Sequence, residues 1–262
     1  MGSLRIATQD MGSSLRSWRL WSLLGWTEIR QRYARSKLGP FWLTISMGTV
    51  IGAIGLVFGA LLGQDMKTYL PMLSIGMVAW TLLSTIVIDG CNAYINSVQY
   101  IRQVNTPRLI YMLQNLWRNF IIFLHNFIIV LIVFSIFGVK NWSTIPMFIP
   151  GLAVLILNAL WMAVIAGLLS ARFRDLPQIV MSFMTMMFYV TPIMFASNAL
   201  TKHAWIVDLN PFAYLIEIVR APLMGSLPSA RVWAVSLSMT IAGWLLALIL
   251  TGRYHKRIPY WL

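Results

Sequence analysis

The sequence predicts an all-α membrane protein. We expect six transmembrane helices, an N-terminal amphipathic interface helix, and short re-entrant helices between spans five and six. Of the 262 residues, 59% are hydrophobic and only 10% are charged, whereas soluble domains carry roughly 25% charged residues. Six runs without Asp, Glu, Lys or Arg each reach the length of about 20 residues that a bilayer-crossing helix needs. The alternation typical of barrel strands is absent, so the spans are expected to be helices.

The predicted spans follow one another within a single transmembrane domain, 1–262. They cover residues 40–63, 69–91, 118–138, 147–170, 176–196 and 231–252. The long connection between the last two, 197–230, contains the stretch NPFAYLIEIVRAPLMG. This stretch is too short and too charged for a full crossing, so it predicts one or two short helices that lie at, or dip into, the membrane face.

The distribution of basic residues predicts how the chain is oriented. Fifteen Lys and Arg fall on the side that carries both termini, and five fall on the other side. Because cytoplasmic loops of membrane proteins are enriched in Lys and Arg, both termini are expected in the cytoplasm. The net charge of +13 is therefore largely a signal of topology. Membrane lipid is the expected environment, and a nucleic-acid partner is not expected.

The segment 15–38 predicts an interface helix, because its aromatic and basic residues separate at 100° per residue. Glu28 and Arg32 fall opposite a narrow arc, which consists of Leu15, Trp18, Ser22, Trp26, Ile29 and Tyr33. Two interpretations stay open. The helix is either an anchor that only orients the first span, or a docking surface for a cytoplasmic partner. The second gains weight from the length of the helix and the mixed charge of its outward face.

Five stretches, in order along nearly the whole chain, resemble the permeases of type-2 ABC exporters. WTEIRQRYARSKLGPFW is similar to the family's interface helix, and ARFRDLPQIV to the turn between spans four and five. YVTPIMF is similar to a Thr-Pro-Ile motif in span five, NPFAYLIEIVRAPL to the outer gate helices, and IPYWL to the C-terminus. The set looks most like permeases that export lipid-linked O-antigen, capsule or teichoic acid across the bacterial inner membrane.

The resemblance implies an assembly of two copies of this chain with two copies of a separate nucleotide-binding ATPase. No G-x-x-x-x-G-K-[ST] motif occurs in the sequence, so ATP and Mg²⁺ are expected on the partner. The resemblance also implies a coupling helix at 97–106. The candidate residues for ATPase coupling are Glu28, Arg32, Tyr33, Ser97, Tyr100, Arg102, Thr106, Arg172, Arg174 and Asp175. An ordinary cytoplasmic loop and a tight basic turn remain the alternatives for the two later groups.

A conduit for sugar chains needs aromatic rings, which stack on the C–H faces of sugars, and polar groups, which bind hydroxyls. The candidate channel residues are Phe41, Trp42, Phe58, Phe183, Phe188, Tyr189 and Pro192. Packing against lipid or other helices is the alternative for each of them. The candidate outer-gate residues are Asn210, Pro211, Phe212, Glu217 and Arg220. Glu217 and Arg220 are three apart on a predicted helix and can pair, with a surface ion pair as the alternative.

The sequence shows no catalytic or metal-binding constellation. His125, His203 and His255 are far apart, and no H-E-x-x-H motif or cluster of carboxylates occurs. We therefore expect a non-enzymatic transport subunit that exports a lipid-linked, O-antigen-like polysaccharide. The alternatives are a small-molecule or drug exporter of the same family, a teichoic-acid or capsule permease, and a membrane enzyme acting on lipid-linked sugars.

Overall fold

The computed structural model describes residues 2–34, 36–39, 41–61, 63–104, 106–138, 141–195, 204–255 and 257–262. Its elements are α1 (Gly2–Arg16), α2 (Trp18–Tyr33), α3 (Phe41–Leu61), α4 (Met66–Asn96), α5 (Val98–Gln103), α6 (Leu109–Phe137), the 3₁₀ helix η1 (Trp142–Met147), α7 (Phe148–Arg172), α8 (Leu176–Val190), α9 (Ala204–Leu209), α10 (Pro211–Leu223), α11 (Ala230–Tyr254) and α12 (Ile258–Trp261). Within the described residues there is no strand, so the predicted all-α fold class is confirmed.

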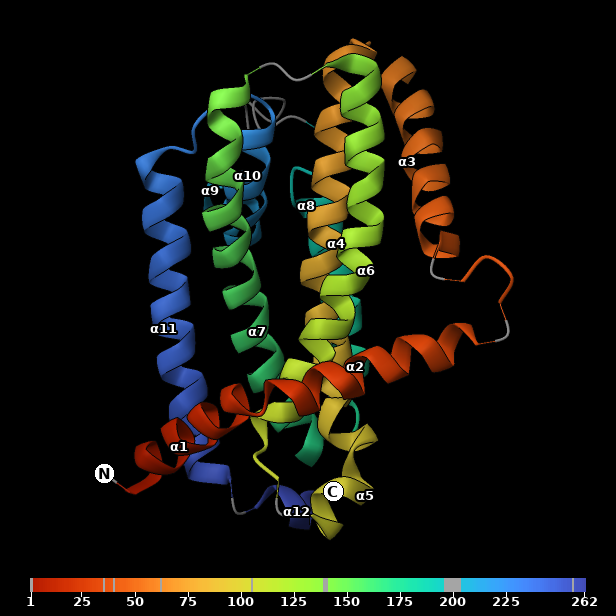
Figure 1. Ribbon diagram of the computed structural model, residues 1–262. Coiled ribbons are helices and arrows are strands. Elements are labelled where there is room, and N and C mark those ends of the chain that lie inside the picture. Colours follow the sequence, from red (N-terminus) through yellow and green to blue (C-terminus); the bar gives the residue numbers. More distant parts are fainter. Residues whose placement is uncertain are drawn as a thin grey trace.

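The long helices run side by side, and α1 and α2 lie across their lower ends (Figure 1). Among the described residues, five helical segments are long and apolar enough to cross a membrane: α3, α4, α6, η1 with α7, and α11. The fold is thus that of an all-α, multi-pass membrane protein. Both marked chain ends lie at the end of the bundle where α1, α5 and α12 gather (Figure 1).

The helix in the fifth predicted span is shorter than expected. α8 has 15 residues, or about 22 Å of helix, against a hydrocarbon core of about 30 Å. It ends at Val190 because Pro192 disfavours helical backbone in the residue before it. Accordingly, Thr191 is extended, with φ −79° and ψ 137°. Residues 196–203, which include the end of this predicted span and the start of the predicted outer region, lie outside the described residues.

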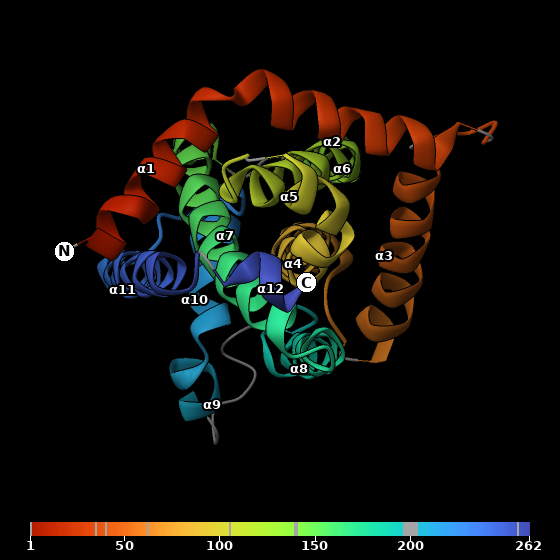
Figure 2. The same cartoon turned by 90° about the horizontal axis from the view of Figure 1, so that it is seen from below.

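The centre of the fold is α4, which packs against α3, α6, α7, α8 and α10. Its crossing with α7 is very close: a Cβ atom added to Gly90 would lie 2.5 Å from the Cβ of Ala163. Small residues at such crossings allow the two backbones to approach and pack tightly. In contrast, α3 lies at the edge of the bundle (Figure 2), and only 11% of its most apolar stretch is buried.

The N-terminal region forms two helices where the sequence analysis expected one helix over 15–38. α1 packs against α11 and α6, while α2 packs against α6 (Figure 2). The break falls at Ser17, whose side chain donates a hydrogen bond of 2.9 Å to the carbonyl of Ser13. Serine side chains that bond to nearby backbone groups compete with helix continuation. α1 was not predicted, because the expected helix was begun at Leu15, although Leu4, Ala7 and Met11 precede it at helical spacings of three and four.

Candidate functional site

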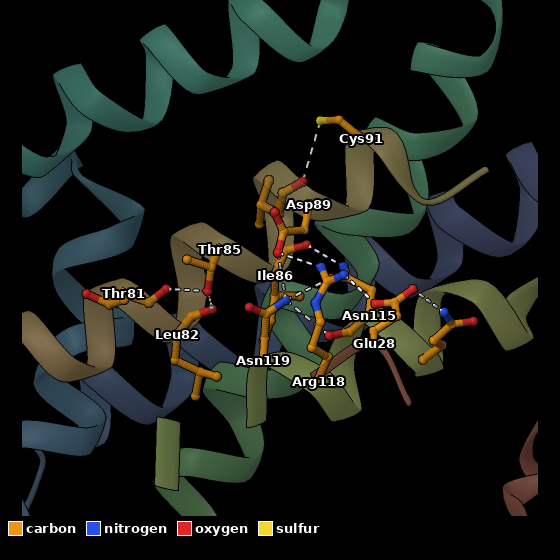
Figure 3. A network of polar contacts seen from close by, with 12 residues as sticks. Glu28, Thr81, Leu82, Thr85, Ile86, Asp89, Cys91, Asn115, Arg118 and Asn119 are labelled. Atoms are coloured by element: carbon orange, nitrogen blue, oxygen red, sulfur yellow. Dashed lines mark hydrogen bonds and ion pairs between the residues drawn. The ribbon is translucent and has the colours of Figure 1, made fainter. Parts of the chain in front are cut away.

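A charged network ties the interface region to the bundle (Figure 3). Arg118 of α6 forms two ion pairs, with Nη1 2.5 Å from Glu28 Oε2 of α2 and Nη2 2.7 Å from Asp89 Oδ2 of α4. The Arg118 side chain is only 15% exposed, and the two carboxylates are partly exposed. A guanidinium with ionised partners makes strong, directional hydrogen bonds. One side chain thus joins three helices.

Amides from α6 complete this network. Asn119 donates to Asp89 Oδ2 at 3.1 Å and to Asn115 Oδ1 at 2.7 Å. Asn115 in turn donates to the backbone carbonyl of Ile86, at 2.9 Å, and Gln114 donates to Glu28. The network holds two carboxylates and one guanidinium, so with these groups ionised it carries a net charge of −1. Breaking such a pair by removing one partner leaves a poorly solvated charge, which is costly.

Sequence reasoning singled out Glu28 but missed Asp89, Arg118, Asn115 and Asn119. A usable signal was present. Asp89 lies at the end of one apolar run, and Asn115 stands at the start of the next. Arg118 and Asn119 follow Asn115 by three and four residues, and this spacing places all three on one helix face. Arg118 was instead counted only as a charge that sets orientation.

A groove of about 380 Å³ opens beside the network, between α3, α4 and α6. Its polar wall presents hydrogen-bond acceptors. Thr81 and Thr85 donate their hydroxyl protons to the carbonyls of Met77 and Thr81, at 2.8 and 2.6 Å. Their lone pairs are left to accept. Asn126 also lines the groove, and its buried Oδ1 has no hydrogen-bond partner. The groove is therefore suited to ligands that donate hydrogen bonds.

The candidate coupling residues lie on three segments at one end of the bundle. Glu28 is in the network, Tyr33 is the last residue of α2, and the side chain of Arg32 lies outside the described part of the chain. Ser97 joins α4 to α5, where Tyr100 and Arg102 are exposed. The α5 segment is followed by Thr106, whose hydroxyl lies 2.8 Å from that of Tyr111.

The third segment is the turn between α7 and α8, which holds Arg172, Arg174 and Asp175, all of them exposed. Asp175 directly precedes α8. Its side chain makes no capping hydrogen bond, so the carboxylate stays available to solvent or to a partner.

The candidate channel residues separate into two groups. Phe58, Phe188 and Tyr189 line a cavity of about 170 Å³ between α3 and the end of α8, together with Thr191, Met194 and Phe195. Phe41, Trp42 and Phe183 are exposed and do not line this cavity. Pro192, which follows the cavity residue Thr191 in the chain, is buried. The structure thus brings three of the seven candidates together.

The outer-gate candidates surround a buried arginine. Arg220 of α10 is only 5% exposed. Its Nη2 lies 2.6 Å from Glu217 Oε2, and its Nη1 donates to the carbonyl of Pro192 at 2.6 Å. Asn210 caps α10 and donates to Thr191 at 2.9 Å, Pro211 begins the helix, and Phe212 packs against Trp80. The pair is therefore more than a surface contact, because it fixes α10 to the end of α8.

No group of three or more His, Cys, Asp or Glu side chains that could hold a metal ion occurs among the described residues. His125 bonds through Nδ1 to the carbonyl of Ile121, one turn earlier in α6, at 2.8 Å. The arrangement around Arg118 joins helices and borders a groove, so its chemistry is that of binding and mechanical connection.

The apolar helices and the polar network within them define a multi-pass membrane protein with an internal groove. A family model described as "ABC-2 type transporter" matches residues 19–224. The match covers most of the chain, which therefore belongs to the ABC-2 type transporter family.

Several curated relatives carry the name "O-antigen export system permease protein RfbA". One from Klebsiella pneumoniae is 24% identical over 191 residues, which cover 72% of this chain and 74% of the relative. A second from Klebsiella pneumoniae is 22% identical over 231 residues, or 87% and 88% of the two chains. One from Myxococcus xanthus is 23% identical over 201 residues, or 74% and 76%. The resemblance to O-antigen permeases is thus confirmed, and the chain is a transport subunit.

Proposed function

We propose that two copies of this chain form the conduit of an ATP-driven exporter for a lipid-linked, O-antigen-like polysaccharide. In this proposal the chain lies in the bacterial inner membrane with both termini in the cytoplasm. Two copies of a separate ATPase bind there and hold ATP and Mg²⁺. The names of the relatives support the substrate class. The family match to residues 19–224 supports the division of labour between a permease and a motor subunit.

One observation carries the coupling part of the proposal: Arg118 joins Glu28 of α2 to Asp89 of α4. α2 lies across the ends of the long helices, where a cytoplasmic subunit can contact it. A displacement of α2 then acts on α4 through charge-assisted hydrogen bonds, which are roughly twice as strong as neutral ones. The most apolar part of α4 is largely buried against other helices, so moving α4 moves the helices packed on it.

Two features support a sugar chain as cargo. The groove beside Asp89 presents acceptors to hydroxyl groups. The cavity of Phe58, Phe188 and Tyr189 presents rings to the C–H faces of sugars. At the same end of α8, Arg220 donates to the carbonyl of Pro192, so a movement of α10 is transmitted to the end of the channel helix, as a gate requires.

The experiment is reconstitution in proteoliposomes with the ABC ATPase encoded nearest to this chain in its genome. We expect lipid-linked polysaccharide in the leaflet that carries the ATPase to reach the opposite side of the membrane only when both subunits and ATP are present. Export by the chain alone would contradict the proposal, and so would chemical conversion of the lipid-linked sugar by the purified chain.

A second assay separates the proposal from its runner-up, a small-molecule or drug exporter. Cells that carry Tyr189→Ala are expected to lose surface polysaccharide without a change in drug tolerance. Altered drug tolerance with intact surface polysaccharide would favour the small-molecule exporter, because the apolar cavity beside Tyr189 would then serve a smaller cargo.

A further inference from the structure

The short helix α12 is fixed beneath the bundle by specific contacts. Ile258 is completely buried. The ring of Trp261 lies 5.3 Å from that of Tyr254 and 5.5 Å from the guanidinium carbon of Arg172, in the α7–α8 turn. Arg174 of the same turn donates to the backbone carbonyl of Leu262 at 3.3 Å. α12 is therefore held against the turn that contains three of the candidate coupling residues.

The contacts leave one large side chain of α12 pointing away. Tyr260 is 89% exposed, while its neighbour Trp261 is packed. Tyr100 of α5 and Phe173 of the α7–α8 turn are also exposed. α12 contacts both α5 and α7, and Figure 2 shows α12 between α5 and the start of α8. Three exposed aromatic side chains thus lie on three adjoining segments.

These rings are not placed to contact lipid. In the proposed function α1 and α2 lie at the membrane surface, and α5 and α12 lie beyond them, away from the long helices (Figure 1). Aromatic groups exposed together in the aqueous phase mark a surface for another protein. Tyrosine is also enriched among the residues that contribute most to binding energy at protein interfaces.

The charge around these rings indicates the chemistry of the partner. Arg102, Arg174 and Arg257 are exposed on the same three segments, against the single carboxylate of Asp175 in their described residues. A partner with an apolar pocket rimmed by Asp and Glu complements such a face, because opposite potentials steer association. The face is also continuous with the candidate coupling segments, so the subunit that contacts them reaches Tyr260 as well.

We propose that α12 is a docking element for the motor ATPase, with the Tyr260 ring inserted into an apolar, acid-rimmed pocket of that subunit. The inference rests on the proposed function. It assigns a role to the end of the chain that is distinct from α2, α5 and the α7–α8 turn. Because α12 holds the α7–α8 turn through Arg172 and Arg174, a motor bound to Tyr260 also grips that turn.

The test measures binding of the separately purified ATPase, the one encoded nearest in the genome, to the chain in nanodiscs. We expect Tyr260→Ala to weaken binding on the order of tenfold or more, and Tyr260→Phe to restore most of it. The matched control is Trp142→Ala, an aromatic residue 74% exposed at the opposite end of the bundle, which should bind like the wild type. Arg257→Gln should slow association and reduce its dependence on salt.

Crosslinking gives a second measurement that does not depend on truncating the ring. Cys91, the chain's one cysteine, is buried, so a photoreactive maleimide on Tyr260→Cys reports on that site. We expect a crosslink to the ATPase, and none from Trp142→Cys.

The role of α12 would be overturned if Tyr260→Ala bound the ATPase like the wild type, Tyr260→Cys gave no crosslink, and Tyr100→Ala weakened binding. That result would leave the proposed function intact. Failure of the wild-type chain to bind the ATPase at all would overturn both.

Discussion

The backbone N–H of Arg108 donates a hydrogen bond of 2.7 Å to the carboxylate of Asp10, a residue 98 positions earlier in the chain. The next N–H, of Leu109, donates to the other carboxylate oxygen at 3.0 Å. These two N–H groups open α6, and the side chain of Arg108 itself gives no cap. Helix starts leave N–H groups without intrahelical partners and favour negative charge. Asp10 therefore supplies from α1 the cap that α6 lacks locally.

Removing this cap should destabilise the fold. We expect Asp10→Ala to cost about 2 kcal/mol, because two buried N–H groups lose their acceptor, and Asp10→Asn to cost less. Thermal unfolding of the purified protein in detergent measures the loss. Gln9→Ala, on the exposed neighbour, is the control. An unchanged melting temperature in Asp10→Ala would show that α1 does not stabilise α6.

The Arg118 network should respond differently to charge and to geometry. Arg118→Met leaves Glu28 and Asp89 facing each other without a cation. We expect a cost of about 2 kcal/mol, below the range for fully buried pairs because both carboxylates are partly exposed. Arg118→Lys keeps the charge but cannot contact both acids with one planar fork. It should recover part of the stability but little of the coupling.

Coupling is measured as the stimulation of ATPase activity by substrate in the reconstituted complex. Because Glu28 and Asp89 act through one guanidinium, the Glu28→Gln and Asp89→Asn changes should be non-additive in a double-mutant cycle. Additive effects would contradict a connection through Arg118.

Packing between α4 and α7 leaves no room for a side chain at Gly90. Gly90→Ala would place a methyl group 2.5 Å from the Cβ of Ala163, and overpacking of this kind costs about 1–3 kcal/mol. Gly52→Ala in α3 adds the same methyl group where no atom lies within 4 Å, so it should be neutral or mildly stabilising. Melting temperatures of the two variants provide the comparison. Equal values would mean that the α4–α7 crossing tolerates separation.

The acceptor groove can be tested with an isosteric change. Thr85→Val keeps the shape of the side chain and removes the hydroxyl oxygen of a residue that lines the groove. We expect polysaccharide export to fall severalfold at unchanged expression. Thr185→Val removes a hydroxyl with the same type of bond, to Met181 one turn earlier at 2.9 Å, on an exposed face of α8. Surface polysaccharide per cell is the readout, and an equal loss in both variants would assign no role to the groove.

The bundle was predictable from the sequence because long charge-free runs have few alternatives to membrane-crossing helices. α1 was not predictable in the same way. Its buried residues are Ala7, Asp10 and Ser14, while Leu4 and Leu15 of its apolar stripe are exposed. The contact that holds it, from the Asp10 carboxylate to two backbone N–H groups, therefore lies beside the stripe that periodicity detects. The early end of α8 had a readable signal in Pro192, but the charge-free run around it outweighed that signal.

The candidate site was predicted in parts. The family motifs pointed to Glu28, but its position in the sequence gave no indication of the residues that it contacts. Asp89 and Arg118 are far apart in the chain, so only tertiary packing reveals that they meet. The aromatic candidates show the same limit: composition selects rings such as Phe41 and Phe58 equally, while their positions near opposite ends of α3 decide that only Phe58 lines the cavity.

The near-contact of Gly90 with Ala163 has a consequence for how the helices of this protein can move. Helices whose backbones touch cannot slide or tilt apart without losing this close packing, so we expect α4 and α7 to move together as one rigid unit. The outlying α3 is connected through Gly39 and Gly63, both with positive φ, and meets α4 closely near its end, at Gly55 and Gly59. We therefore expect an opening of the bundle to displace α3 against the fixed pair of α4 and α7. A compound bound between α3 and α8 is then expected to block export while ATP hydrolysis by the partner continues.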